Sequence, residues 1–215
     1  MNVAIIDADL VGKKKHRFPN LVCMKLSGHY KEYGDKVTLK LDYDNLDDYD
    51  QIFISKVFTD TPIDSQILQL NNVRYGGTGF YYDQAPSLPD EIEHHMPDYH
   101  LYDDWVYEQL NKGDKRLDYK YYLDYSIGYS TRGCFRHCEF CVNKNYNKVE
   151  LHSPLHEFLD PSRKKICLLD DNVFGYSKWK NIFLELQSTG KSFQYKQGLD
   201  ERLLTDEKMQ NTFQQ

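Results

Sequence analysis

The first part of the chain alternates short apolar runs with amphipathic or polar stretches. Four runs predict strands, the last of which runs into a glycine turn: "VAIID" (3–7), "KVTLKL" (36–41), "QIFISKVF" (51–58) and "VRYGGTGF" (73–80). "FPNLVCMKLSGHYKEYGD" predicts a helix that stops at Gly34, and "DSQILQL" predicts a helix capped by Asp64. Strands that alternate with helices favour a parallel sheet with helices on its faces. We therefore expect a Rossmann-like domain over residues 1–85.

Such a domain would bring four segments to one edge of its sheet, where the strands end. These segments are Asp7, the loops Lys13–His16 and Lys56–Thr61, and the glycine segment Gly76–Gly79. Ligands of open parallel sheets bind in the crevice at that edge, so we expect a crevice there.

A second strand and helix pattern begins at residue 125. Residues 86–124 are rich in Pro, Asp and His without a sustained period, and they predict a connector. Three strand predictions follow, at "YSIGYS" (125–130), "KKICLLDDN" (164–172) and "SFQYKQGLDERLL" (192–204). "SKWKNIFLELQSTGK" predicts an amphipathic helix, and "TDEKMQNTF" predicts a helix capped by Thr205.

Composition excludes some classes of protein. The chain has 215 residues, 40% of them hydrophobic, and a formal net charge of −6, which argues against a general nucleic-acid partner. It has no apolar run of membrane-spanning length, and its first residues do not resemble a signal peptide. We therefore expect a cytoplasmic protein without a membrane partner.

Three of the five cysteines fall within eight positions, in "GYSTRGCFRHCEFCVNKNY" (128–146). Cys134, Cys138 and Cys141 have the spacing C-x3-C-x2-C. Structural zinc needs a fourth ligand, for which only His137 or His152 is near. Three thiolates in one loop would instead hold three irons of a [4Fe–4S] cluster and leave the fourth iron open. Zinc and three structural cysteines stay as alternatives, whereas Cys23 and Cys167 are predicted core residues.

A cysteine motif of this spacing after a strand, with Phe140 directly before the last cysteine, resembles the signature of the radical S-adenosylmethionine enzymes. The resemblance implies that the three cysteines ligate a [4Fe–4S] cluster whose open iron binds S-adenosylmethionine. Reductive cleavage would then give a 5′-deoxyadenosyl radical that abstracts hydrogen from a substrate that we cannot name. It also implies that Phe140 packs near the adenine and that a flavodoxin- or ferredoxin-like protein donates the electron.

The resemblance extends along the second half of the chain. "ICLLDDN" is similar to the family's second barrel strand, which implies that Asp170, Asp171 and Asn172 bind the methionyl amino group. The family more often has Gly-Gly-Glu there, and the alternative is that these residues cap the next turn. "KQGLDERLL" resembles the third strand and its loop, which implies that Gln197, Asp200 and Arg202 face the cavity.

The N-terminal segment resembles the cobalamin-binding modules that precede the barrel in many members. Gly76, Gly77 and Gly79 would receive the nucleotide tail of cobalamin, but the Asp-x-His-x-x-Gly segment that supplies a cobalt ligand is missing. The alternative is a domain kept for packing or substrate recognition.

Residues 125–215 have room for about three of the six β/α units of the family's (β/α)6 partial TIM barrel. We therefore expect the first half of that barrel, in a truncated or shortened chain or in a subunit that a partner completes. The alternative function is a degenerate, non-catalytic module that binds iron–sulfur or zinc.

Overall fold

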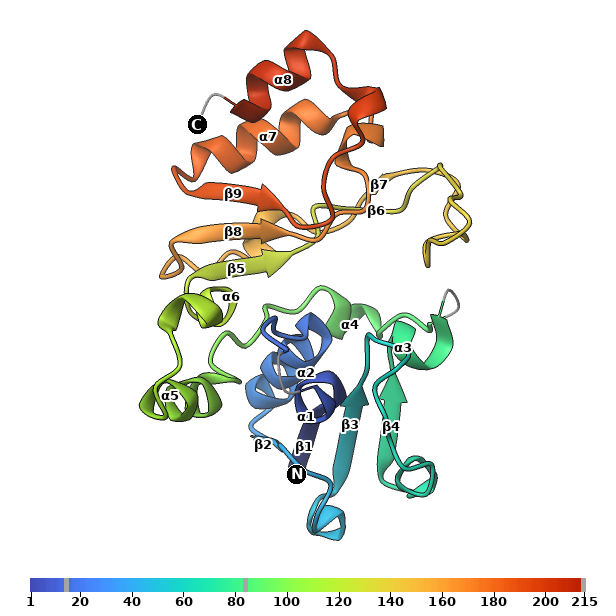
Figure 1. The fold of residues 1–215 in the computed structure, drawn as a ribbon, viewed down its shortest axis with the longest axis vertical. Coiled ribbons are helices and arrows are strands. Elements are labelled where there is room, and N and C mark those ends of the chain that lie inside the picture. Colours follow the sequence, from blue (N-terminus) through green and yellow to red (C-terminus); the bar gives the residue numbers. More distant parts are fainter. Residues whose placement is uncertain (14–15, 83–84, 214–215) are drawn as a thin grey trace. The chain divides into compact units, whose positions relative to one another are not determined.

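The computed structural model describes residues 1–13, 16–82 and 85–213 of a mixed α/β protein. The chain divides into two compact units, residues 1–123 and 124–215. One contains a four-stranded parallel sheet and the other a three-stranded parallel sheet (Figure 1).

The sheet of the first unit has the strand order β2-β1-β3-β4, with every pair parallel. Its strands are β1 (Asn2–Asp7), β2 (Lys36–Leu39), β3 (Gln51–Ser55) and β4 (Val73–Gly76). All four were predicted from apolar runs, and β1 is buried on both faces from Val3 to Ile6, as its unbroken apolar pattern indicates.

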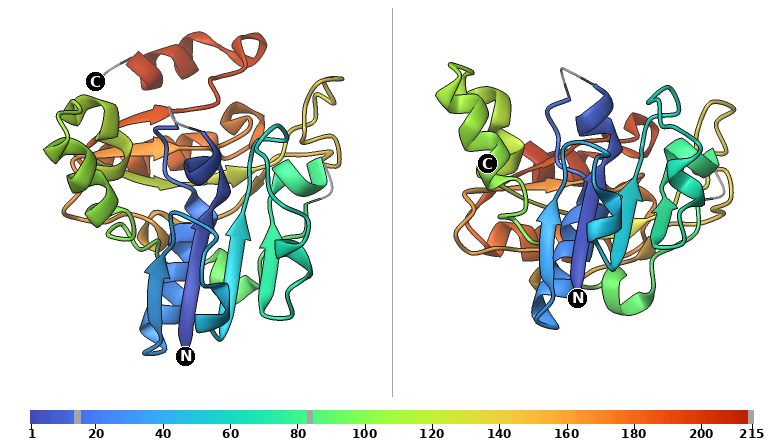
Figure 2. Two further views of the ribbon diagram at one scale, coloured as in Figure 1. Left: turned by 60° about the horizontal axis from the view of Figure 1, so that its bottom comes forward. Right: turned by 90° about the horizontal axis from the view of Figure 1, so that it is seen from below.

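One face of this sheet packs against α2 (Leu21–Glu32), and Figure 2 shows the helix behind the strands. Asn20 caps α2, because its side chain accepts hydrogen bonds from Val22 N at 3.1 Å and Cys23 N at 3.3 Å. Gly34 ends the turn after the helix with a φ of 81°, which glycine adopts readily. The predicted helix is therefore confirmed, with its stop.

The opposite face is covered by the short helix α1 (Ala8–Gly12), by loops and single 3₁₀ turns, and by Phe80 of the short helix after β4. The helix predicted over "DSQILQL" is wrong: Asp64 accepts a hydrogen bond from Gln66 N at 2.9 Å, but only a 3₁₀ turn, Ile67–Gln69, follows. Ile67, Leu68 and Leu70 all pack on the same apolar cluster as Ile52 and Ile54. A segment this short gains more from placing three apolar side chains on the sheet than from a marginal helix.

The segment that the sequence indicated as a connector belongs to the core of the first unit. It contains α4 (Asp90–Glu93), α5 (Asp103–Asn111) and α6 (Lys120–Leu123), and after β4 comes the short α3 (Thr78–Tyr81). Tyr102, Tyr119 and Tyr122 are nearly or fully buried in one cluster with Val3 and Ile5. Aromatic side chains supply this packing, so the usual aliphatic periodicity is absent from the sequence.

The sheet of the second unit has the order β5-β8-β9, again parallel, from β5 (Tyr125–Gly128), β8 (Lys165–Leu168) and β9 (Ser192–Tyr195). The amphipathic helix α7 (Trp179–Ser188) runs alongside β9 (Figure 1), and the Phe183 ring lies 5.8 Å from that of Phe193. The last helix, α8 (Asp206–Phe213), has Lys208 N 3.3 Å from Thr205 Oγ1, which confirms the predicted cap.

An antiparallel pair, β6 (Thr131–Arg132) with β7 (Glu150–Leu151), lies in the connection from β5 to β8. Among the described residues of that connection the only helical turn is the 3₁₀ segment Leu155–Glu157. The sequence did not predict this pair, which closes the base of the loop that carries the three cysteines.

Candidate functional site

The three clustered cysteines lie in the loop between β6 and β7. Cys134, Cys138 and Cys141 are all partly exposed and none forms a disulfide, whereas Cys23 and Cys167 are buried as predicted. Cys141 N donates to Cys138 O at 3.0 Å, and Asn143 N donates to Cys141 Sγ at 3.4 Å. The loop thus makes turns of its own around its second and third thiols.

Asp170 fixes the entrance to this loop from the end of β8. It is fully buried and accepts four hydrogen bonds from two residues. Ser130 donates through N at 2.9 Å and Oγ at 2.6 Å, and Thr131 through N at 2.7 Å and Oγ1 at 2.6 Å. Burial raises the pKa of this carboxyl, although the four donors act in the opposite direction. Through these four hydrogen bonds Asp170 holds the backbone at the entrance to the loop.

Asp171 reaches the loop itself. It accepts hydrogen bonds from Gly133 N at 2.8 Å and from Asn143 Nδ2 at 2.6 Å. Gly133 has a φ of 95°, and a Cβ there would lie 2.4 Å from the Lys148 carbonyl oxygen, so only glycine fits. The same carboxylate therefore contacts the residue before the first cysteine and the residue two after the last.

Asn172 contacts the first thiol directly. Its Nδ2 lies 3.5 Å from Cys134 Sγ and 3.4 Å from Asp200 Oδ2. Its Oδ1 is buried and accepts no hydrogen bond from a described residue. A buried amide oxygen without a donor is unfavourable by about 1–3 kcal/mol, so this atom is suited to receive a donor from a ligand.

Asp200 joins two arginines beside Asn172. Arg136 Nε lies 2.6 Å from its Oδ2 and Arg202 Nε lies 2.8 Å from its Oδ1. Burial would raise the pKa of Asp200, but the hydrogen bonds from Arg202 and Arg136 outweigh it and lower the pKa to about 2. Two guanidinium groups on one carboxylate leave a net positive charge next to the cysteine loop.

Two predicted site residues lie apart from this network. Phe140 is 84% exposed, and Gln197 is exposed in the turn after β9 and makes no hydrogen bond with a described residue. The adenine contact of Phe140 stays a prediction.

The donor chemistry suits an iron–sulfur cluster, because three unpaired, partly exposed thiols share one loop. The three thiols are not arranged as a metal site in this structure. No three His, Cys, Asp or Glu side chains among residues 1–13, 16–82 and 85–213 are grouped so as to hold a metal ion. The exposed part of the loop would have to bring the thiols together.

Sequence reasoning missed the partners that organise this loop. Ser130, Thr131 and Asn143 are ordinary polar residues in the sequence, and their contacts with β8 span 28 to 40 positions. The only signal is the pair of aspartates at the end of a buried strand, which indicates a polar network without identifying its members.

The edge of the first unit's sheet brings together the predicted segments as far as they are described; Lys14 and Lys15 of the Lys13–His16 loop lie outside the described residues. Asp9 accepts from Val57 N at 2.7 Å and from Thr61 Oγ1, and Lys13 Nζ lies 2.7 Å from Asp60 Oδ2. The helix that follows β1, with Lys13 at its end, is thus tied to the loop after β3.

The glycine segment packs on one of these loops. A Cβ on Gly77 would lie 2.3 Å from the Lys56 carbonyl oxygen, and a Cβ on Gly79 would lie 2.7 Å from Lys56 Cγ. Gly79 N also donates to Lys56 O at 2.9 Å, whereas Gly76 has open space around it. Close approach to Lys56 therefore explains Gly77 and Gly79 without a bound nucleotide.

Asp7 is fully buried at the end of β1. Tyr102 OH donates to its Oδ2 at 2.9 Å and Leu10 N to its Oδ1 at 3.2 Å. Burial raises the pKa of Asp7 to about 6, and the nearby His16 and the Tyr102 hydrogen bond limit the rise. Asp7 lies beneath the edge and serves the packing of the 86–123 segment through Tyr102.

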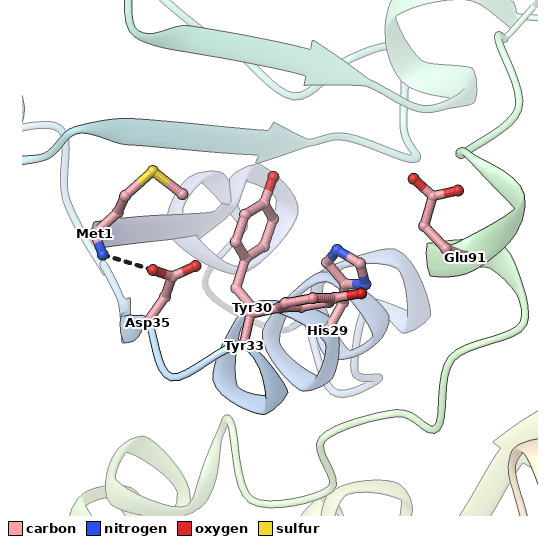
Figure 3. A pocket seen from close by; sticks show the side chains of 6 residues that line it. All are labelled: Met1, His29, Tyr30, Tyr33, Asp35 and Glu91. Carbon is pink, nitrogen blue, oxygen red and sulfur yellow. Dashed lines mark hydrogen bonds and ion pairs between the residues drawn. The ribbon is translucent and has the colours of Figure 1, made fainter.

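A shallow hollow of about 430 Å³ lies elsewhere on the first unit. Figure 3 shows it between the start of β1, the end of α2 and α4, with Met1, His29, Tyr30, Tyr33, Asp35 and Glu91 around it. The Met1 ammonium already pairs with Asp35, and no cysteine or other predicted site residue lines the hollow. It has no connection with the chemistry that the sequence indicates.

Comparison with known proteins returned no match to a family profile, to a curated sequence or to a solved structure. In the described part of the chain, no helix has both the length and the apolar character that crossing a membrane requires.

Proposed function

We propose that the second unit is an iron–sulfur domain of the radical S-adenosylmethionine type, with Cys134, Cys138 and Cys141 as ligands of a [4Fe–4S] cluster. The observation that carries the proposal is the position of this C-x3-C-x2-C loop. It follows a parallel strand, β5, and is hydrogen-bonded to the end of the neighbouring strand β8 through Asp170 and Asp171. Loops at the carboxyl ends of parallel strands are the usual place for a bound cofactor.

The proposal for the fold rests on the order of the parallel strands in each unit. The order β5-β8-β9 follows the sequence with all strands parallel, which supports the first strands of a (β/α)6 partial barrel. The order β2-β1-β3-β4, which reverses at β1, supports a Rossmann-like first unit. The connection from β5 to β8 departs from the pattern, since its described residues include only the 3₁₀ turn named above.

The three residues at the end of β8 would then have two different roles, holding the cysteine loop and binding S-adenosylmethionine. Asp170 and Asp171 hold the loop, because their oxygens are engaged by its backbone and side chains. Asn172 Oδ1 is left to accept a hydrogen bond from the methionyl ammonium group of S-adenosylmethionine. This is a narrower role than the sequence implied for the three residues together.

The positive groups around the loop complete the site. Arg136 and Arg202 would offset the negative charge of three thiolates, and the exposed ring of Phe140 would pack near the adenine. Gln197, Asp200 and Arg202 remain the proposed cavity residues for an unknown substrate.

When bound and reduced by a flavodoxin- or ferredoxin-like donor, the cluster would supply the electron that cleaves S-adenosylmethionine. The protein's own part is to bind and orient that molecule and to exclude water around it. Free thiols throughout the chain support a cytoplasmic location. Cobalamin in the first unit is a weaker proposal, because Gly77 and Gly79 are already explained by Lys56.

Anaerobic reconstitution with iron and sulfide tests the ligand assignment. We expect about four iron atoms per chain in the wild type, and a loss of most of that iron when Cys134, Cys138 and Cys141 are all changed to Ala. Cys23→Ala is the matched control, since that thiol is buried in the first unit and should leave iron uptake unchanged. Full uptake by the triple variant would show that the cluster is bound elsewhere.

A non-catalytic module that binds iron–sulfur or zinc is the second candidate. The β5–β8 connection favours it, because its described residues contain only a 3₁₀ turn where a β/α unit of the barrel has a helix. The formation of 5′-deoxyadenosine under dithionite separates the two functions. If the cluster-loaded protein gives no product, it is the non-catalytic iron–sulfur module. If the protein takes up zinc in preference to iron, it is a non-catalytic module that zinc stabilises.

A further inference from the structure

The Asp171 carboxylate joins the two ends of the segment that contains all three clustered cysteines. It contacts Gly133, directly before Cys134, and Asn143, two residues after Cys141, at 2.8 and 2.6 Å. We infer that Asp171 is a positioning residue that closes segment 133–143 and thereby limits the separation of the three thiols. We call this pair of hydrogen bonds the clasp.

The neighbours of Asp171 cannot replace it in this role. Asp170 bonds to Ser130 and Thr131, which precede the segment, and Asn172 contacts only its first thiol. The β6–β7 pair closes the chain farther out, between Thr131–Arg132 and Glu150–Leu151. The His137–Lys144 contact spans only Cys138 and Cys141. Of these closures the clasp is therefore the tightest one that encloses all three cysteines, and it leaves only the cysteine-bearing segment between its two ends.

The closed segment also holds a disfavoured backbone conformation. His137 has a φ of 49°, in the left-handed region that residues with a Cβ seldom adopt. Its Nδ1 lies 3.0 Å from the Lys144 carbonyl oxygen, just beyond the clasp. A strained turn persists when its surroundings hold it, so the segment is expected to relax outward once the clasp is removed.

The clasp acts on the thiols whether or not a metal is bound, and its consequence for iron rests on the proposed function. Donors that are already held near one another lose less conformational freedom when they bind a metal. The wild-type segment should therefore retain iron longer than a segment whose ends are free.

Cysteine labelling in the reduced, metal-free full chain tests the clasp. Asp171→Ala and Asp171→Asn are compared with the wild type by reaction with N-ethylmaleimide and peptide mass spectrometry. Asp206→Asn, an exposed position at the start of α8, is the matched control. Loss of two charge-assisted hydrogen bonds predicts labelling of Cys134 and Cys141 at least about tenfold faster in Asp171→Ala. Asp171→Asn should lie between, because its amide oxygen can still accept from Gly133 N.

Cys167 serves as the folding control within the same unit, since it is fully buried on β8. Unchanged labelling of Cys134 and Cys141 in Asp171→Ala, with Cys167 still protected, overturns the clasp. If Cys167 becomes labelled, the Asp171→Ala variant has unfolded. The clasp is then tested with Asn143→Ala, which removes only the 2.6 Å hydrogen bond between Asn143 and Asp171. About threefold faster labelling of Cys141 in that variant supports the clasp, and no change overturns it.

Transfer of iron to a chelator from reconstituted protein gives the second readout. We expect about tenfold faster loss of iron from Asp171→Ala than from the wild type or Asp206→Asn. If the wild type takes up no iron, the proposed function fails, while the labelling result still decides the clasp by itself.

Discussion

Two fully buried carboxylates, Asp7 and Asp170, lie at the ends of central or inner strands but are hydrogen-bonded very differently. Asp170 accepts four hydrogen bonds from Ser130 and Thr131. Asp7 accepts two, from Leu10 N and Tyr102 OH. Burial raises the pKa of both, and for Asp7 it does so to about 6. Asp7 is therefore the group through which pH should affect the first unit.

Because the pKa of Asp7 is raised in the folded state, we expect the first unit to lose stability toward unfolding as the pH rises from about 4 to about 6. Its pKa is about 6 when folded and near 3.8 when unfolded, so the folded state binds the proton more tightly. The free energy of unfolding should then be highest below pH 4 and lower above pH 6, by about 3 kcal/mol for this group. Asp7→Asn should abolish that difference.

Urea unfolding followed by Trp105 fluorescence in a Trp179→Phe background measures this, because it leaves only the tryptophan of the first unit. The quantity to compare is the change in unfolding free energy between pH 4 and pH 6.5 in the two proteins. An equal change with and without Asp7 would assign the pH dependence to other groups.

Gly77 and Gly113 have nearly the same φ, 103° and 102°, in different surroundings. A Cβ on Gly77 would meet the Lys56 carbonyl oxygen at 2.3 Å, and a Cβ on Gly113 would meet nothing within 4 Å. We expect Gly77→Ala to lower the unfolding free energy of the first unit by about 3 kcal/mol or more. Gly113→Ala should lower it by about 1–2 kcal/mol from backbone strain alone. Equal losses, measured with the same Trp105 reporter, would contradict the close contact with Lys56.

Helix α7 illustrates what an amphipathic pattern can predict about an element. Phe183 is fully buried, with ring centroids of Phe174 at 5.5 Å, Trp179 at 5.6 Å and Tyr195 at 5.7 Å. Its burial follows from the period of the helix, and the next residue, Leu184, is 52% exposed. The helix thus packs on β9 through one stripe of side chains.

Phe183→Ala should reduce the unfolding free energy of the second unit by about 3–5 kcal/mol, because it removes a ring from the middle of a packed core. Leu184→Ala, on the exposed side of the same helix, should change it by about 0.5 kcal/mol or less. Urea titration with Trp179 as the only tryptophan, in a Trp105→Phe background, gives both values. Similar losses in the two variants would contradict the packing of α7 through one side only.

There is a physical reason why some elements were predicted correctly from local patterns and one was not. The strands β1, β3 and β8 and the helices α2 and α7 were predicted, because each buries a continuous or periodic set of apolar residues. The 3₁₀ turn at Ile67–Gln69 was mistaken for a helix, since its apolar residues pack on the sheet without helical hydrogen bonds. Short segments take their conformation from the surface they cover.

In the molecule taken as a whole, the five cysteines fall into two environments. Cys23 and Cys167 are fully buried, one in each unit, and the pKa of Cys23 is raised by burial. The other three are partly exposed. A thiol reacts through its thiolate, so buried thiols should react slowly.

Titration with a disulfide reagent such as DTNB should therefore find three rapidly reacting thiols in the native, metal-free protein. The same titration in guanidinium chloride should find all five. Fewer than three fast thiols would mean that the cysteine loop is less exposed than the structure indicates. Four would mean that one of the two cores opens readily, and five would mean that both do.

The sequence by itself determined the order along the chain of the strands in the two parallel sheets and the helices α2, α7 and α8. It also predicted that Cys23 and Cys167 are buried and that Cys134, Cys138 and Cys141 form a candidate metal-binding motif. These follow from apolar period and from residue spacing, which are local properties. Only the tertiary structure decided that residues 86–123 complete the core of the first unit and that Gly77 and Gly79 pack on Lys56. It also decided that Asp170 and Asp171 hold the cysteine loop, through contacts that span 28 to 40 residues. Hydrogen bonds across such separations depend on how strands are brought together, so no local pattern in the chain could predict them.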